Sequence, residues 1–211
     1  MLAPQAWRKE VNTTPSFILA SRHRVAHEAM WQDVQGHVRI GLGHLLPTAD
    51  HAVALPWWTG RDRHVATEDE VLRDWQKIAD YRRPGRPARF PGLGQKVLTR
   101  VRLTDDGLQR TFASDFTWAF NKVRQMFGDG FDTLPGGAQL ALIDLQMFGG
   151  LTSAISIAAD VRDWKKAAES LDLGHDAFRQ KELVRLFIEA SKPTKVLHAK
   201  MDRHWGPRAG E

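Results

Sequence analysis

Apolar positions in the first part of the chain predict a helix that leads into a short hairpin. The sequence Thr-Thr-Pro at 13–15 joins a capping residue to a proline at the first helical position, and predicts a helix over about residues 15–31. Apolar residues then recur at the two-residue period of a strand, at Val38, Ile40 and Leu42. A short β-hairpin is therefore expected after the helix.

The next segments predict an irregular stretch and a second helix. Residues 50–63 have no clean period and contain Pro-Trp-Trp, so we expect a loop or an additional structured excursion there. Thr67 and Glu70 have the spacing of a capping box, and the apolar residues after them recur at helical spacing. This pattern predicts a helix that ends near Tyr81.

The second half of the chain has a helical pattern throughout. A helix start is indicated around Thr104, and the apolar face of the long helix that follows is formed by Leu108, Phe112, Phe116, Phe120, Val123 and Phe127. Residues 138–148 are almost all apolar before a Gly-Gly pair, which predicts a helix buried on most sides. Three further amphipathic helices are expected around residues 152–159, 161–171 and 176–190.

The stretch at 82–92 is dense in proline, glycine and arginine, and such a composition breaks helices and favours a solvated connection. It is the predicted connection between two lobes of a single α+β, mostly helical domain. The small lobe (13–81) would contain the hairpin, and the larger helical lobe (93–191) would surround the buried helix, followed by a basic tail (192–211).

The composition indicates which binding partners are favoured and excludes some classes of protein. The length of 211 residues suits one domain, and the formal charge of +5 favours anionic partners such as wall polymers, nucleic acid or anionic lipid. There is no cysteine, which excludes a disulfide scaffold and a thiolate zinc site. No apolar stretch is long enough for membrane insertion or a signal peptide, so synthesis in the cytoplasm without a signal peptide is expected.

Two glycine-containing motifs in the hairpin region carry a resemblance to a known family. Residues 31–36 read Trp-Gln-Asp-Val-Gln-Gly and residues 40–47 read Ile-Gly-Leu-Gly-His-Leu-Leu-Pro. With the apolar run at 141–149, the Trp-Lys-Lys-Ala-Ala at 164–168 and a basic helix containing Arg179, the order of these pieces resembles phage-type lysozymes and the related muramidase effectors that bacteria inject into rivals.

The resemblance implies a lysozyme-like fold and hydrolysis of the peptidoglycan glycan strand at the linkage from N-acetylmuramic acid to N-acetylglucosamine. Such a protein would be an antibacterial or phage lysis factor acting in the periplasm or outside the cell. Glycosidic cleavage needs an acid that protonates the leaving oxygen and a second carboxylate. The resemblance assigns the second role to Asp33. The alternative is that Asp33 only caps the turn before Gly36.

The pattern departs from the family at two catalytic positions. The family's acid position is occupied here by Arg24, and a position that is commonly threonine is occupied by Arg39. An arginine has no proton to donate near neutral pH. Glu28 would share a helical face with Arg24 at i and i+4 spacing, so it either replaces the acid or is a salt-bridged surface residue.

The remaining site candidates each have a structural alternative. His44 either orients the acid or the hairpin, or is a structural histidine satisfied by the backbone. Asp144, Gln146 and Phe148 either line the glycan cleft or serve internal contacts with the hairpin. Arg24 and Arg39 are counted with these four as substrate-binding candidates.

Other chemistry is less well supported by the sequence. The pair His23 and His27 lacks the glutamate of a zincin motif, so no metal site and no cofactor are expected. Trp57 and Trp58 either stack on sugar rings or cover the core. The arginine run at 82–89 contains no known nucleic-acid motif, so nucleic-acid binding is not expected. No feature of the sequence predicts an oligomeric state.

One alternative function belongs to a different class. With arginine at two catalytic positions, the chain would be a catalytically inactive lysozyme-fold protein, natural or engineered, that binds the cell wall or serves as a scaffold. Binding of peptidoglycan without turnover would distinguish this alternative from the hydrolase.

Overall fold

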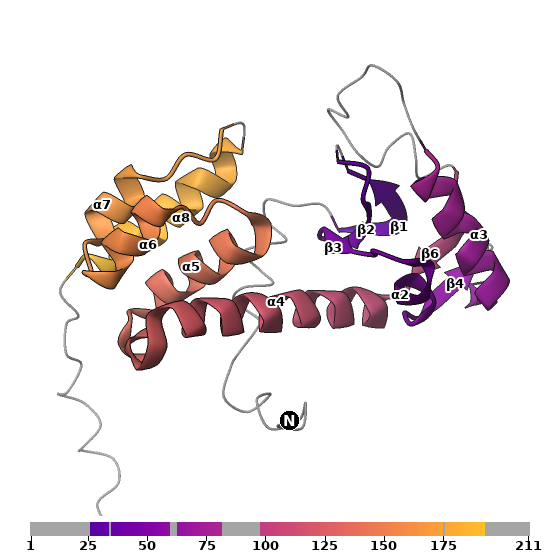
Figure 1. Cartoon of the computed structure of the whole chain (residues 1–211), viewed down its shortest axis with the longest axis horizontal. Coiled ribbons are helices and arrows are strands. Elements are labelled where there is room, and N and C mark those ends of the chain that lie inside the picture. The colour runs from indigo at the N-terminus through magenta and orange to yellow at the C-terminus, as the bar shows by residue number, and fades with distance from the viewer. Residues whose placement is uncertain (1–25, 34, 60–62, 82–97, 175, 193–211) are drawn as a thin grey trace, which may run out of the picture.

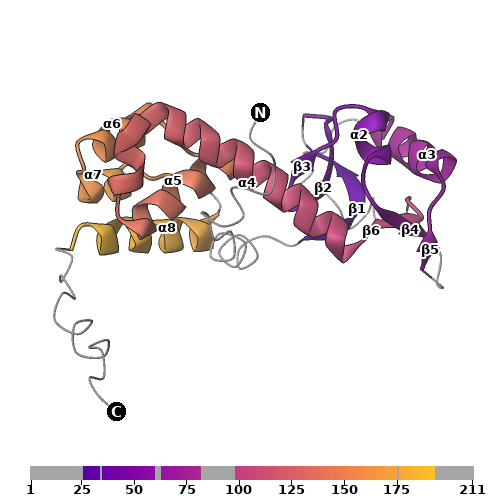
Figure 2. The same cartoon turned by 90° about the horizontal axis from the view of Figure 1, so that it is seen from below.

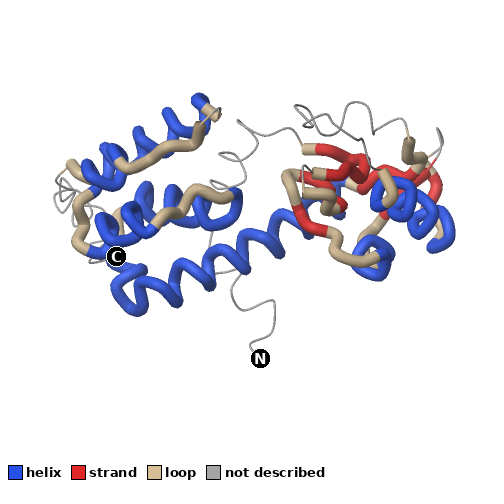
Figure 3. Tube along the Cα trace, turned by 45° about the horizontal axis from the view of Figure 1, so that its top comes forward, coloured by secondary structure: helices blue, strands red, loops and turns tan. Residues whose placement is uncertain are grey.

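The computed structural model describes residues 26–33, 35–59, 63–81, 98–174 and 176–192. It is a mixed α+β structure in which the strands lie in one lobe and most of the helices in another (Figure 1). One long helix runs from the first lobe into the second, and Figure 3 shows the strands confined to one of its ends. No helix in the described part of the chain combines the length and the apolar character needed to cross a membrane.

The first sheet is an antiparallel hairpin extended by a third short strand. Its order is β1-β2-β3, and the strands are β1 (His27–Gln32), β2 (Val38–Gly41) and β3 (His44–Leu45). Trp31 lies opposite Arg39 across the β1–β2 pair, and the register shifts between His27 and Trp31. The hairpin turn therefore places Asp33 and residues 35–37 at one end of this sheet.

The second sheet joins chain segments that lie far apart in the sequence. Its order is β5-β4-β6, and its strands are β4 (Trp57–Thr59), β5 (His64–Val65) and β6 (Val101–Leu103). Two helices complete this lobe, α2 (Ala49–Val53) and α3 (Glu68–Ala79), and they pack on each other. The shared core consists of Met30, Val38, Ile40, Leu46, Ala52, Trp57, Val71, Ile78, Val101 and Leu103.

The long helix is α4 (Asp105–Phe127), and Figure 2 shows it passing diagonally between the two lobes. The Thr104 side chain caps it by accepting a hydrogen bond from the Gly107 N–H. Gly107 also lies so close to Leu103 that a Cβ would stand 2.6 Å from that side chain. Glycine at this position therefore allows the helix to begin directly against the second sheet.

The helical lobe is built around one buried helix. The 3₁₀ helix η2 (Gly128–Thr133) is followed by α5 (Gly136–Phe148), α6 (Ser153–Asp160), α7 (Trp164–Glu169) and α8 (Ala177–Ala190). Helix α5 packs against both α4 and α8, and α8 packs against α7. Leu142 and Leu145 are completely buried, which confirms the prediction of a central apolar helix.

Several elements predicted from the sequence are confirmed. The capping box of Thr67 and Glu70 is present at the start of α3, and Val38 begins a strand of the expected hairpin. The long helix and the three predicted helices that follow α5 are also present. The segment 50–63, expected to be a loop or an additional structured excursion, contains part of α2 and the strand β4, which agrees with the second alternative.

The prediction of a helix over residues 15–31 is wrong from His27 onward, where the chain forms β1. Pairing with β2 and burial of Ala29 and Met30 in the sheet decide the conformation there, because tertiary contacts override a weak helical pattern. Residues 15–25 lie outside the described residues.

The path of the chain between the lobes also differs from expectation. Residues 101–103, expected in the helical lobe, form β6 and pair with β4 in the strand lobe. The described connection between the lobes is therefore α4, while the predicted connection at 82–92 lies outside the described residues. The two lobes are therefore joined by a continuous α-helix, whose backbone hydrogen bonds run along its whole length.

The buried position of α5 gives a direct stability prediction. Leu142→Ala removes a fully buried side chain and should lower the free energy of unfolding by about 2–5 kcal/mol, since it leaves a cavity in the core. Urea denaturation followed by circular dichroism measures this change. Ile157→Ala on α6, where the side chain is 65% exposed, is the control and should change stability little. Equal losses in both variants would contradict the central role of α5.

Candidate functional site

The turn between β1 and β2 is organised around the carboxylate of Asp33. Its Oδ1 accepts hydrogen bonds from the backbone N–H groups of Gln35 and His37, both at 2.9 Å. The Asp33 N–H donates to the His37 carbonyl at 2.9 Å, and Gly36 completes the turn with φ of +88°. Asp33 thus caps this turn, as one of the two interpretations of the sequence predicted.

A second set of contacts binds the same carboxylate to β2. Arg39 Nε donates to Asp33 Oδ2 at 2.6 Å, and Arg39 Nη1 donates to the Gly43 carbonyl at 2.8 Å. His37 Nδ1 lies 3.4 Å from the same Oδ2 atom. One arginine therefore connects the β1–β2 turn to the β2–β3 turn, and the Asp33 side chain is only 13% exposed.

These contacts decide the charge of Asp33. Partial burial by itself would raise the pKa of this carboxyl, because it penalises the charged form. The hydrogen bonds from Arg39, His37 and Gln35 and the charge of Arg39 outweigh that effect, and the pKa is lowered below its ordinary value. Asp33 is therefore held as a carboxylate, which can stabilise a developing cation but cannot serve as the proton donor.

Glu28 does not occupy the position that the sequence predicted for it. It lies on the strand β1 rather than on a helix, so the interpretation based on helical i and i+4 spacing is wrong for this residue. Its charge acts on Arg102 of β6. Burial lowers the pKa of Arg102, while the carboxylates of Asp74 and Glu28 oppose that shift. Arg24 lies outside the described residues.

The carboxylates of Glu28 and Asp33 thus act on different arginines. Asp33 bonds to Arg39 beside the hairpin turn, whereas Glu28 interacts with Arg102 on the second sheet. A pair of catalytic carboxylates needs both groups to face the same glycosidic bond. The contacts of the described residues do not bring Glu28 and Asp33 together.

His44 connects the hairpin to the long helix. Its Nδ1 lies 2.8 Å from Asp115 Oδ1, and Asp115 belongs to α4. The histidine is therefore engaged by a carboxylate rather than by the backbone that the sequence analysis expected for a structural histidine. This contact orients β3 against α4, which agrees with the role of orienting the hairpin.

Of the three candidates on α5, Asp144 is buried and Gln146 and Phe148 are half-buried. Asp144 is buried and forms an ion pair with Arg179 of α8, with 2.6 Å between Asp144 Oδ1 and Arg179 Nε. Arg179 also donates to the Gly149 carbonyl at 2.8 Å and lies over the ring of Phe148 at 5.8 Å. Among the contacts of the described residues, the ion-pair partner of Asp144 is thus Arg179 of α8, whereas a partner on the hairpin was expected.

The tryptophans and histidines considered from the sequence take different roles. Trp57 is buried and donates its indole N–H to the Ala52 carbonyl at 2.6 Å, so it belongs to the core. Trp58 lies beneath the guanidinium of Arg63 at 4.9 Å. Among the described residues, no group of three histidine or acidic side chains is arranged to hold a metal ion.

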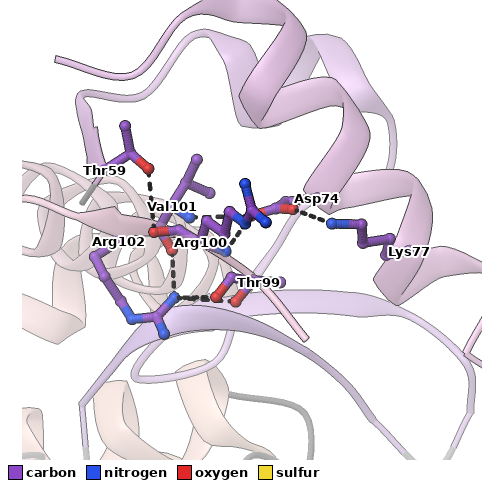
Figure 4. Close-up of polar contacts among 7 residues, drawn as sticks. All are labelled: Thr59, Asp74, Lys77, Thr99, Arg100, Val101 and Arg102. Carbon is purple, nitrogen blue, oxygen red and sulfur yellow. Dashed lines mark hydrogen bonds and ion pairs between the residues drawn. The ribbon is translucent and has the colours of Figure 1, made fainter. Parts of the chain in front are cut away.

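Sequence reasoning missed one buried polar residue, Asp74 of α3. Its carboxylate accepts from the backbone N–H groups of Arg100 and Val101 and from Lys77 Nζ, the last at 3.0 Å. Figure 4 shows Lys77 reaching Asp74 from the helix, while Arg102 extends the other way toward Thr99. The spacing of Asp74 from Val71 and Ile78 placed it on the apolar face of the helix, and this signal could have identified it.

Comparison with known proteins gives no family assignment. No protein-family model, no curated protein and no solved structure matches this chain.

The lowered pKa of Asp33 predicts a pH-dependent contribution to stability. Arg39→Thr removes the strongest partner of the carboxylate and should cost about 1 kcal/mol at neutral pH, a value reduced because Arg39 is partly exposed. A carboxyl with a lowered folded-state pKa stabilises the protein above its unfolded pKa of about 4, and this contribution is lost as pH falls through the folded value.

Urea denaturation of the wild type and Arg39→Thr across a series of pH values measures this linkage. The difference between them should be largest near neutral pH and should close as pH falls through the lowered folded-state pKa of Asp33. Arg110→Thr, which removes an exposed arginine paired only across one turn of α4 with Asp106, is the matched control. A deficit of Arg39→Thr that stays constant with pH would show that the arginine acts through packing alone.

The ion pair between Asp144 and Arg179 gives a larger predicted effect. Arg179→Met should destabilise the protein by about 3–5 kcal/mol, because Asp144 would stay buried without its guanidinium partner. The double variant Asp144→Leu with Arg179→Met should recover part of that loss in thermal denaturation, since it removes both charges. A double variant less stable than the single one would refute this electrostatic explanation.

Proposed function

We propose that this chain is a lysozyme-type, muramidase-like protein whose target is the glycan strand of peptidoglycan. The observation that carries the proposal is the ionised Asp33, fixed at the hairpin turn by Arg39 and two backbone N–H groups. In a muramidase the second carboxylate must stay charged to stabilise the oxocarbenium-like transition state. The lowered pKa of Asp33 meets that requirement.

The surroundings of Asp33 support the same proposal. In the Gly41-Leu42-Gly43 turn, Gly41 is buried against Thr111 of α4 and Gly43 is half-buried, so Gly43 is the position at which a sugar would approach the backbone of this turn. The hairpin is fixed by the contact of His44 with Asp115, so the position of the Asp33 turn relative to α4 is defined. A preorganised carboxylate of this kind costs little reorganisation when a substrate binds.

Hydrolysis of the linkage from N-acetylmuramic acid to N-acetylglucosamine also needs a proton donor. The resemblance places Arg24 at that position, and a guanidinium has no proton to give near neutral pH. We therefore expect slow cleavage by the wild-type chain. The protein would act on the wall outside the cytoplasm, and its positive charge would hold it on that anionic polymer.

A second candidate function is peptidoglycan binding without turnover. The observation that favours it is the direct bond of Arg39 to Asp33, because an ion pair of this kind weakens the field that a carboxylate exerts on a developing cation. Glu28 adds to this, since it lies on β1, its charge acts on Arg102 of β6, and no contact among the described residues joins it to Asp33. Such a protein would hold glycan strands and leave them intact.

Restoration of the missing acid tests both candidates. The wild type should sediment with purified sacculi but release few soluble glycan fragments. Arg24→Glu combined with Arg39→Thr should increase release by at least about tenfold, since general acid catalysis contributes roughly 10²–10⁴-fold. Asp33→Asn in that background should abolish the gain. Arg110→Thr serves as the control for loss of surface charge.

Other results of this binding and release experiment would lead to a different assignment of function. Full lytic activity of the wild type that is lost in Glu28→Gln without a change in Tm would make Glu28 the acid and overturn the assignment of Arg24. Binding with no gain in the restored variant would favour the second candidate. Neither binding nor release by any variant would refute a role in peptidoglycan.

A further inference from the structure

A small pocket lies between α3 and the chain that leads into β6. Its volume is about 130 Å³, and its lining consists of Glu70, Arg73, Asp74, Lys77 and Arg100. Three of these side chains are cationic, two are acidic and none is apolar. A charged group is therefore the kind of ligand that this lining suits.

Both acidic side chains of the pocket are already occupied by the fold. Asp74 is buried and accepts from two backbone N–H groups at the start of β6 and from Lys77. Glu70 closes the capping box, since it accepts from the Thr67 backbone N–H at 2.8 Å and from the Thr67 hydroxyl at 3.1 Å. Both carboxylates are therefore bonded within the fold, and no hydrogen bond or close ion pair among the described residues joins either of them to a guanidinium of the pocket.

The guanidinium N–H donors of Arg73 and Arg100 are available to a ligand. Arg73 and Arg100 are both exposed, and within the described part of the chain neither guanidinium forms a hydrogen bond or a close ion pair. Glu70 acts on Arg73 only through its charge. The pocket thus has two guanidinium groups, from α3 and from the chain that enters β6, beside the ammonium group of Lys77.

We propose that this pocket binds a phosphate-type oxyanion through the guanidinium groups of Arg73 and Arg100. Guanidinium forks bond to phosphate oxygens in a bidentate manner, and two forks from different segments surround a tetrahedral anion better than a planar carboxylate. Lys77 adds a positive charge while it remains bonded to Asp74. The small volume limits the bound part to one anionic group.

The pocket is separate from the Asp33 turn, and the proposal does not depend on the proposed function. It shares no residue with that turn and is built from α3 and the start of β6 instead of the hairpin. Two sources could supply the same chemistry, namely free inorganic phosphate and a phosphodiester within an anionic polymer. A polymer bound here would anchor the strand lobe independently of any glycan contact.

Nuclear magnetic resonance titration with inorganic phosphate, at constant ionic strength, tests the site. In the wild type, the amide signals of Arg100 and Val101 should shift and reach saturation. Arg73→Gln and Arg100→Gln should each weaken binding by about tenfold or more, the loss expected for one charge-assisted contact. The backbone N–H of residue 100 still bonds to Asp74 after substitution, so the fold should be retained.

Arg110→Gln on α4 is the control, because it removes an exposed arginine outside the pocket and should bind phosphate like the wild type. Absence of saturation, or equal affinity in both pocket variants and the control, would overturn the proposal. Acetate that binds as tightly as phosphate would also overturn the preference for a tetrahedral anion.

A final titration with poly(glycerol phosphate) identifies the source. Competition between the polymer and inorganic phosphate for the same amide shifts would support a phosphodiester ligand. Saturation by inorganic phosphate alone would support a site for the free anion. Both results support an oxyanion pocket formed by Arg73 and Arg100, and neither bears on cleavage of glycan.

Discussion

The structure depends above all on how the hairpin is held against the long helix α4. Leu42, at the β2–β3 turn, is buried in the same cluster as Phe112 and Leu142 of the helical lobe. The contact of His44 with Asp115 lies beside it, and Gly41 has no side chain where a Cβ would stand 3.2 Å from Thr111 on α4. These contacts join the hairpin that carries Asp33 to the helical lobe at the β2–β3 turn.

In each lobe, one buried aspartate joins elements that lie apart in the sequence. Asp74 joins α3 to the start of β6, and Asp144 joins α5 to α8 through Arg179. Backbone N–H groups and a lysine satisfy the first, while a guanidinium that also reaches two carbonyls satisfies the second. Because an unpaired buried charge is very costly, these contacts favour a single packing of the elements that they join.

The sequence predicted the local elements better than their assembly. The capping box at Thr67, the cap at Thr104 and the apolar run of α5 are encoded by neighbouring residues, and all three are present in the structure. The strand β1 was missed because its conformation depends on pairing with β2, which no local pattern reports. The pairing of β6 with β4 joins segments about forty residues apart, so it too required the tertiary structure.

In the candidate site too, neighbouring residues predicted the local turn but not the contacts between distant side chains. The turn role of Asp33 followed from its place before Gly36, whereas its bond to Arg39 and the partner of Asp144 on α8 depend on side-chain directions in the folded chain. The interpretation of Glu28 was wrong because it assumed a helix where the chain is extended.

Under the proposed function, the charges at the hairpin would act differently on binding of a glycan and on its cleavage. Arg39 lowers the pKa of Asp33 and so keeps it charged, which suits the second carboxylate of a muramidase. The same arginine partly cancels the negative field that a cationic transition state would experience, although it leaves further N–H donors for sugar hydroxyls. Under the proposed function, arginine at positions 24 and 39, where the sequence departs from the family's pattern, would favour ground-state contacts with a glycan over stabilisation of its transition state. Only stabilisation that is specific to the transition state accelerates a reaction.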